Sequence, residues 1–360
     1  MKILRIYPFL PPMAGGMEKH IYNLTTAQRS IGFDVTIAFS EGKRTHDDDI
    51  ILPTRFKLRA LRPAACRSFI FYCYLVCYLL LNRPKFDAVH IHGDWSDAIF
   101  CPLIKWLVDA NVTVFSFHGF LGERFTQKRL LPKLIKYFNA TYCTGYDSYK
   151  YLQNKEPEKV HFIHSGINQS FLDTASLLPL HDRHYDVVSV ANFVSVKNHQ
   201  FMLQIAKKMP QFNFCFVGDG VLLDKSKEFV SLAGMSNVTF LGGVNSEEVV
   251  LALDNSKVFL LASIEEGTPT SVIEAMSRGL PVIAAKVGGV EHIVKDSDNG
   301  IVLDGYVIND FVKGLTMFLE STELYAKVKK INRSYAEAHS WHCVASTISK
   351  LFIIDNKGCK

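Results

Sequence analysis

The chain alternates short apolar runs with longer segments of helical character. KILRIY, DVTIAF, FDAVHIH and VTVFSFHG each have the length and composition of a buried strand. This alternation is typical of a parallel β-sheet whose strands are joined by crossover helices. After residue 180 it restarts with YDVVSVAN, NFCFVGDG, SNVTFLGG and SKVFLLAS. We therefore predict an α/β protein with two Rossmann-like, doubly wound domains.

The predicted domain boundary lies near SLLPLHDRHY (176–185), where polar residues and a proline interrupt the pattern. It gives an N-terminal domain (1–180), a C-terminal domain (181–338) and a terminal helical segment (339–360). A length of 360 residues fits two domains better than one. Open sheets of this kind bind ligands beyond the carboxyl ends of their strands. We therefore expect the binding residues in the turns after the apolar runs, facing the cleft between the domains.

Two acidic residues, Glu266 and Glu274, stand in the segment EEGTPTSVIEAMSRGLPVIAA (265–285). Its pattern predicts a turn after the strand SKVFLLAS and then a short helix that ends at Gly279. Glu266 would lie in the ligand-facing turn and Glu274 in the early helix. Two structural explanations stay open: Glu266 as a solvated turn residue, and Ser271 with Glu274 as a capping box.

Taken in order, the motifs of the chain resemble those of the glycosyltransferase family 4 enzymes, which have the GT-B fold. E-G-x-P, a second Glu and then EAMSRGLPVIAAKVGGVEHIV are similar to the nucleotide-sugar signature of that family. PPMAGGMEKHIYNL, DAVHIHGDW and FSFHG stand in the first domain, and VANFVSVKNHQFMLQIAKKM, FVGDG and FLGGV in the second. The segment HSWHCVASTISKLF resembles a last helix that crosses back onto the first domain; alternatively it is a core helix with Trp341 as its anchor.

The resemblance implies the site residues. Lys197 would meet the donor diphosphate and stabilise the charge on the leaving group, Glu274 would accept hydrogen bonds from the ribose, and Glu266 from the donor sugar. His118 would contact the donor sugar, and the glycines that open the first helix would let backbone N–H groups approach a phosphate. The implied catalytic residues are His118, Lys197 and Glu266, and the implied substrate-binding residues are Gly15, Gly16, Asp94, Asn192, Gly267, Thr268, Pro269 and Glu274.

The chain departs from the family pattern at Asn192, where family members usually carry arginine. Asparagine supplies neither the charge nor the two-pronged donor geometry of a guanidinium. Three outcomes stay open: Lys197 and the helix dipole suffice, another cation substitutes, or activity is weak. The usual Asn-Gly-Val-Asp is also altered, to SGIN (165–168).

The implied reaction is the transfer of a hexose, with retention at the anomeric carbon, from a UDP- or GDP-type nucleotide sugar. The acceptor would be a hydroxyl of a lipid-linked saccharide or of a lipopolysaccharide or polysaccharide precursor. No metal or other cofactor is expected. Asp47, Asp48 and Asp49 contain the D-x-D of metal-dependent glycosyltransferases, but RTHDDDI has the pattern of a solvated loop. A non-catalytic sugar-nucleotide-binding scaffold, a GT-B sugar-nucleotide epimerase and a phosphorylase stay open as alternatives.

Positive charge is concentrated in the first half of the chain, which has 22 Lys+Arg and 15 Asp+Glu through residue 178, against 18 and 20 in the remainder. This half is expected to face an anionic partner and to bind the acceptor through Asp94 and Trp95. In residues 55–84, basic residues precede a charge-free run that is shorter than a bilayer span. They predict either a buried helix or a helix at a membrane surface. The basic segment 123–139 is explained either by a solvated helix face or by membrane contact. No nucleic-acid-binding motif accompanies the charge.

Eight cysteines are scattered through apolar runs without C-x-x-C pairs. This distribution favours reduced, buried thiols and a cytosolic setting. The N-terminal run lacks a signal-peptide cleavage site. Together with the implied acceptor, these features predict a cytoplasmic protein bound peripherally at the inner face of a membrane.

Overall fold

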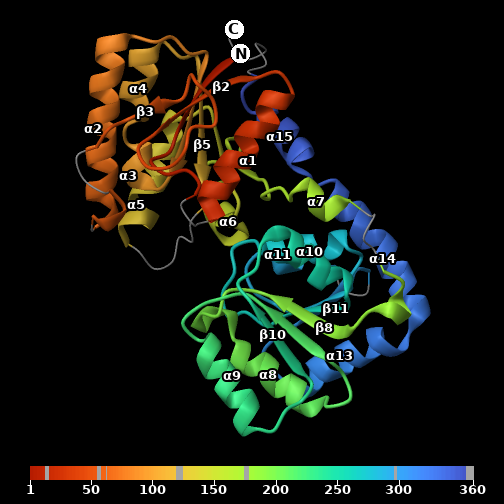
Figure 1. Ribbon diagram of the computed structural model, residues 1–360. Coiled ribbons are helices and arrows are strands. Elements are labelled where there is room, and N and C mark those ends of the chain that lie inside the picture. The colour runs from red at the N-terminus through yellow and green to blue at the C-terminus, as the bar shows by residue number, and fades with distance from the viewer. Residues whose placement is uncertain are drawn as a thin grey trace. The chain divides into compact units, whose positions relative to one another are not determined.

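The computed structural model describes residues 1–12, 16–54, 58–61, 63–118, 125–173, 178–295 and 298–353. The chain forms two compact units (Figure 1). Unit 1 comprises Met1–Gly166 and the segment that begins at Trp341, and unit 2 comprises Ile167–Ser340. The sequence placed the first division at 180/181. The structure has it earlier because Ile167 and Phe171 already lie in the apolar core of unit 2.

Unit 1 is built on a seven-stranded sheet in the order β3-β2-β1-β4-β5-β6-β7, with every neighbouring pair parallel. Its strands are β1 (Lys2–Ile6), β2 (Asp34–Phe39), β3 (Ile50–Ile51), β4 (Ala88–Gly93), β5 (Val112–Phe117), β6 (Ala140–Cys143) and β7 (Val160–Phe162). Its helices are α1 (Gly16–Ser30), α2 (Ala64–Asn82), α3 (Trp95–Ala98), α4 (Cys101–Val108), α5 (Phe125–Leu134), α6 (Tyr146–Gln153) and α15 (Trp341–Lys350). The strand order reverses between β1 and β4, which is where such sheets bind ligands.

Unit 2 is built on a six-stranded parallel sheet in the order β10-β9-β8-β11-β12-β13. Its strands are β8 (Tyr185–Val190), β9 (Phe214–Val217), β10 (Val238–Gly242), β11 (Ser256–Leu261), β12 (Val282–Ala285) and β13 (Gly300–Leu303). Its helices are α7 (Gln169–Leu172), α8 (His199–Lys208), α9 (Leu223–Leu232), α10 (Ser246–Asp254), α11 (Thr270–Ser277), α12 (Val290–Ile293), α13 (Ile308–Glu320) and α14 (Thr322–Glu337). Here the order reverses between β8 and β11. The predicted α/β class with two doubly wound sheets is confirmed.

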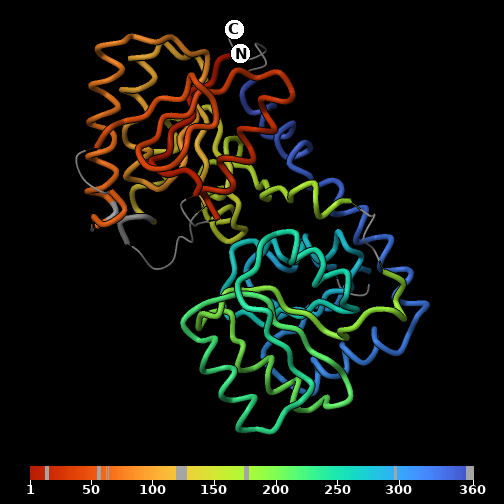
Figure 2. The backbone as a smooth tube through the Cα atoms, viewed as in Figure 1, coloured from red at the N-terminus to blue at the C-terminus, as the bar shows by residue number. Residues whose placement is uncertain are grey.

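Helices cover both faces of the sheet in unit 1, and Figure 2 traces the backbone through these layers. α2 and α4 pack on one face, where Leu75 and Ile104 share a core with β4 and β5. α1 and α15 lie on the other face, where Leu24 and Ile348 pack together. The C-terminal helix therefore completes the core of unit 1.

A buried arginine holds the region around α11 in unit 2. Arg278, at the end of α11, is 0% exposed and forms an ion pair with Asp254 of α10 at 2.6 Å. It also donates to the carbonyl of Phe171, 2.9 Å away. Gly279 follows with a φ of +75°, so the helix ends where the sequence predicts.

The cysteines are reduced in the part of the chain that the structure describes. Three of them are buried as predicted: Cys101, Cys143 and Cys215. The prediction is wrong for the four exposed ones, Cys66, Cys73, Cys77 and Cys343. The first three are exposed because the side of α2 that bears them points away from the sheet. Cys359 lies outside the described residues.

Candidate functional site

Lys197 and Glu266 come together at the point where the strand order of unit 2 reverses. Lys197 ends a 3₁₀ turn (Ser195–Lys197) that follows β8, and Glu266 follows the neighbouring strand β11. Lys197 Nζ lies 2.6 Å from Glu266 Oε1. The Glu266 side chain is only 7% exposed, so the solvated-turn explanation is wrong. The two residues form a half-buried ion pair at the ligand-binding edge of the sheet.

The loop that carries Glu266 is fixed by close backbone contacts. The N–H of Ile264 donates to the carbonyl of Val196 at 2.7 Å, and the N–H of Gly289 donates to the carbonyl of Gly267 at 2.9 Å. Gly288 has a φ of +52°, and a Cβ on it would lie 1.9 Å from the carbonyl oxygen of Glu266. Sequence reasoning missed this role of Gly288. The signal for it is the Gly-Gly pair in the loop after β12, which follows Lys286 and Val287.

The remaining predicted donor contacts lie at the start of α11. Pro269 is the N-cap of this helix and no side chain caps its first N–H groups. Ser271 therefore lies inside the helix, and the capping-box explanation is wrong. Glu274 lies one turn into α11, half-buried and engaged with a partner. The start of α11 presents a partial positive charge beside Gly267 and Thr268.

Asn192 lies just after β8 and is exposed. It shares this edge of the sheet with Lys197, since both residues follow the same strand. Open sheets of this kind bind ligands at this edge, and Asn192 brings no positive charge to it.

In unit 1 the predicted residues follow three neighbouring strands. Gly16 begins α1 after β1, Asp94 follows β4 and His118 follows β5. Gly15 lies outside the described residues. Asp94 is the N-cap of α3: it accepts from the N–H of Ser96 at 2.7 Å, and its own N–H donates to Asp97 Oδ2 at 2.9 Å. Trp95 packs partly buried against the core.

His118 is held by groups of the protein through both ring nitrogens. Its Nε2 lies 3.2 Å from His92 Nδ1, and its Nδ1 lies 3.4 Å from Thr144 Oγ1. The ring of His20 packs edge-on against it, with the centroids 4.4 Å apart. Burial lowers the pKa of His118 to about 3. His118 is therefore a neutral hydrogen-bonding group at physiological pH.

The altered SGIN segment contacts His20, the histidine that packs against His118. Ser165 Oγ lies 2.8 Å from His20 Nδ1, and Tyr142 Oη lies 3.2 Å from His20 Nε2. A Cβ on Gly166 would lie 2.6 Å from the ring of Trp341. Sequence reasoning missed His20 and His92, although His90 and His92 occupy alternate positions of one strand and so point to the same face.

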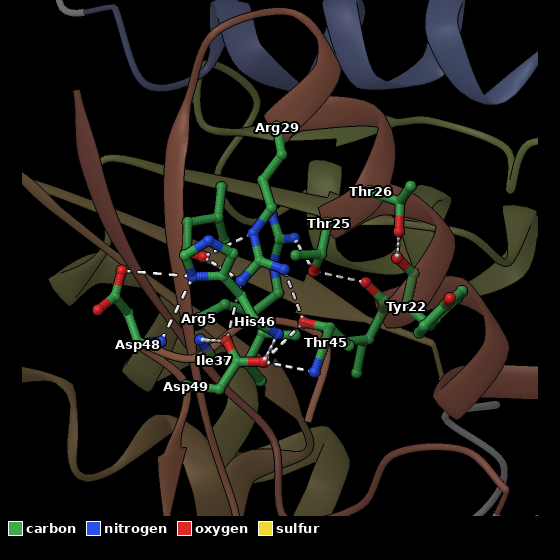
Figure 3. A network of polar contacts seen from close by, with 12 residues as sticks. Arg5, Tyr22, Thr25, Thr26, Arg29, Ile37, Thr45, His46, Asp48 and Asp49 are labelled. Atoms are coloured by element: carbon green, nitrogen blue, oxygen red, sulfur yellow. Dashed lines mark hydrogen bonds and ion pairs between the residues drawn. The ribbon is translucent and has the colours of Figure 1, made fainter. Parts of the chain in front are cut away.

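Of the three aspartates of RTHDDDI, Asp47 and Asp48 are exposed and Asp49 is buried. Asp48 is exposed beside His46. Asp49 is 2% exposed and accepts hydrogen bonds from Thr45, the His46 N–H and the Ile37 N–H, and its Oδ1 lies 2.9 Å from Arg29 (Figure 3). Burial alone would raise the pKa of Asp49, but the hydrogen bonds from Thr45 and Ile37 and the charge of Arg29 lower it overall. The solvated-loop prediction is therefore wrong for Asp49, which ties α1 to β2.

We expect Asp49→Ala to destabilise the protein by about 2 to 3 kcal/mol, because it leaves buried donors without an acceptor. Asp48→Ala is the matched control and is expected to stay within about 0.5 kcal/mol of the wild type. The measurement is the free energy of unfolding in urea. Equal values for the two variants would contradict the structural role of Asp49.

Within the described residues, no three His, Cys, Asp or Glu side chains are grouped so that they could hold a metal ion.

Comparison with known proteins first defines the class. The solved structure of HepE from Anabaena in complex with UDP and glucose matches with a TM-score of 0.74 and 16% identity, over 97% of this chain and 98% of that one. The fold is GT-B. The family model Glycosyltransferase Family 4 matches residues 14–171, and the model Glycosyl transferases group 1 matches 178–335. The chain therefore belongs to glycosyltransferase family 4.

Two curated relatives extend this comparison. An uncharacterized glycosyltransferase of Methanocaldococcus jannaschii is 24% identical over an alignment of 367 positions, which covers 98% of each chain. The UDP-Gal:alpha-D-GlcNAc-diphosphoundecaprenol alpha-1,3-galactosyltransferase of Escherichia coli is 26% identical over 265 residues, 66% of this chain and 67% of that protein.

Proposed function

We propose that this glycosyltransferase retains anomeric configuration and moves a hexose from a UDP- or GDP-type nucleotide sugar to a lipid-linked saccharide or to a lipopolysaccharide or polysaccharide precursor. The observation that carries this proposal is the Lys197–Glu266 pair at the strand-order reversal of unit 2. The Escherichia coli relative, named for a UDP-sugar donor and a diphosphoundecaprenol-linked acceptor, supports the choice of substrates. The complex of HepE with UDP and glucose supports the donor.

The donor site divides the work among charged groups of unit 2. Lys197 binds the diphosphate and stabilises the negative charge that grows on it as the bond to the sugar breaks. The start of α11 adds a partial positive charge. Glu274 accepts hydrogen bonds from the ribose and Glu266 from hydroxyls of the sugar. Before the donor arrives, Lys197 and Glu266 neutralise each other across 2.6 Å, which keeps both side chains in place.

The transfer needs no covalent intermediate on the enzyme. The bond from the anomeric carbon to phosphate breaks, and its electron pair stays on the phosphate oxygen. The acceptor oxygen bonds to the anomeric carbon from the same face and gives its proton to that oxygen. Neutral His118 forms a hydrogen bond with a hydroxyl of the donor sugar in place of its contact with His92 or with Thr144. Asp94 and Gly16 lie on unit 1, which binds the acceptor. No metal ion or other cofactor takes part.

Asn192 motivates the alternative of a non-catalytic scaffold that binds sugar nucleotides. The scaffold and the enzyme differ in turnover and not in binding, so a radiolabelled-sugar transfer assay separates them.

We place the enzyme in the cytoplasm at an anionic membrane surface, where a lipid-linked acceptor is presented.

We expect one nucleoside diphosphate among UDP, GDP and ADP to raise the melting temperature, with or without EDTA. A ligand at 100 times its dissociation constant adds about 2.7 kcal/mol to the stability. Glu274→Ala is expected to abolish the shift, and Glu265→Ala, which changes an exposed neighbour of Glu266, is expected to keep it. No shift with any nucleotide would overturn the donor site, and a shift lost in EDTA would overturn metal independence.

A further inference from the structure

The outward side of α2 is apolar along its length. Its exposed residues recur at steps of three and four, which places them on one side of the helix. They include Cys66, Phe69, Cys73, Cys77, Leu80 and Leu81. Leu81 is 84% exposed and Phe69 is 60% exposed. A helix that faces water carries polar residues at such positions. The composition of this side therefore indicates contact with an apolar environment.

α4 extends the apolar surface. α2 and α4 cover the same face of the sheet side by side (Figure 1), because their inward residues share one core. Trp106 of α4 is 74% exposed, and Leu103 one turn before it is 43% exposed. Phe69 of α2 lies against Phe100 at the start of α4, with ring centroids 6.3 Å apart. We call Phe69, Cys73, Cys77, Leu80, Leu81, Leu103 and Trp106 the outer apolar face.

The charges of the two helices are of one sign. Neither the α2 nor the α4 sequence contains an acidic residue. Lys105 of α4 is partly exposed, whereas the guanidinium of Arg67 on α2 packs over the ring of the buried Phe9. Arg83, which ends α2, is exposed. Lys85 and Asp109 near the far ends neutralise each other at 3.2 Å. An apolar surface with a basic rim is complementary to anionic lipid.

A second copy of this chain fits the face less well. A two-fold dimer through it would bring together two rims of the same positive charge, each with Lys105 and Arg83, and like charges at an interface disfavour association. Anionic headgroups match these charges instead.

The packing of α2 excludes a helix that crosses a bilayer. The segment Ala65–Asn82 of this helix is long and apolar enough to span a bilayer by length and composition. The charge-free run in the sequence did not predict this, because it is shorter than a bilayer span. However, Phe71, Leu75 and Leu79 are 0% exposed in the core of unit 1. Insertion across a bilayer would remove them from that core, whereas contact through the outer side leaves it intact.

We propose that the outer apolar face docks unit 1 on an anionic lipid bilayer, with Trp106, Leu80 and Leu81 at the boundary between headgroups and acyl chains. This proposal rests on the proposed function only for its purpose, which is access to a lipid-linked acceptor. The sequence predicts, as one of two alternatives, this helix at a membrane surface with Arg55, Lys57, Arg59, Arg62 and Arg67 near lipid phosphates. The proposal adds which side of the helix makes the contact. Arg55, Lys57 and Arg62 lie outside the described residues.

The first test is co-sedimentation with vesicles of mixed phosphatidylglycerol and phosphatidylcholine, and with phosphatidylcholine alone. We expect wild-type protein to bind the mixed vesicles. The affinity of the double variant Leu80→Glu/Leu81→Glu for these vesicles is expected to be lower by about tenfold or more. Trp106→Ser is expected to weaken binding in the same direction. Leu232→Glu is the matched control, because Leu232 is 81% exposed on α9 of unit 2, and it is expected to bind like the wild type.

A second measurement uses the native thiols. Mixed vesicles are expected to protect Cys73 and Cys77 from maleimide, while Cys343 on α15, exposed in the same unit, keeps reacting. Absence of both binding and protection would overturn the proposal. So would protection of Cys73 and Cys77 by high protein concentration without vesicles, which indicates a protein-covered face. An intact nucleotide-induced melting shift with no vesicle binding overturns the docking face alone; vesicle binding with no shift overturns the proposed function alone.

Discussion

Lys197→Met is expected to lower the rate of sugar transfer by about 10²- to 10³-fold, the usual effect of removing one group that stabilises a developing anion. The effect falls at the upper end because Asn192 brings no positive charge to this edge of the sheet. Removal of Lys197 also leaves the Glu266 carboxylate, 7% exposed, without its partner at 2.6 Å. We therefore expect a loss of about 1 to 3 kcal/mol in stability as well.

The double variant Lys197→Met/Glu266→Gln separates the two effects. Because both charges are gone, the free energy of unfolding is expected to return toward the wild-type value, while the transfer rate stays low. The measurements are kcat/KM with the donor named by the melting experiment and unfolding in urea. A double variant that recovers activity together with stability would show that Lys197 acts only as a structural partner of Glu266.

Asn192→Arg is the converse variant. If Asn192 faces the diphosphate, an arginine there adds a second cation, and the affinity for the nucleoside diphosphate is expected to rise about tenfold. An unchanged affinity would mean that position 192 does not contact the ligand.

Local sequence patterns could predict the strands and the turns that carry Lys197 and Glu266. The apolar runs are continuous, and a parallel sheet brings all their carboxyl ends to one edge. The pairing of these two residues needed the strand order as well. β8 and β11 become neighbours only because two intervening strands lie to one side.

Features that depend on distant partners could not be predicted. Asp49 sits in a polar stretch, and its burial depends on Arg29 from α1 and the backbone of β2. Gly288 supports Glu266 because the loops after β11 and β12 touch. The first domain boundary was missed because Ile167 and Phe171 join the core of unit 2 before its first strand begins. In each case the deciding contact joins segments that are separate in sequence.

The structure also predicts a steep loss of stability in mild acid. Unit 1 holds four clustered histidines: His20, His90 and His92, which are buried, and the partly buried His118. Burial lowers the pKa of each, and the charge of Arg5 on β1 adds to this for His20, His90 and His92. The facing Tyr142 of β6 is uncharged at this pH, since burial raises its pKa.

The direction follows from proton linkage. Well above pH 6.5 the four histidines are neutral in both states and do not affect the stability. As the pH falls below 6.5, the unfolded chain takes up protons that the folded unit does not, so folding is opposed. From pH 7 to 5.5 this amounts to roughly 1 kcal/mol for each histidine, or about 4 kcal/mol for the cluster. That is a large part of the 5 to 15 kcal/mol typical of a folded protein.

Urea unfolding at pH 7 and 5.5 tests this expectation, with the fluorescence of Trp341, whose ring lies 5.0 Å from that of His20, reporting on unit 1. His92→Leu is expected to make the pH dependence shallower by about one proton. The exposed His46 provides the control, and His46→Gln is expected to leave the slope unchanged. A free energy of unfolding that stays constant between the two pH values would mean that the cluster accepts protons in the folded state, and His118 would then be charged where the proposed reaction requires it neutral.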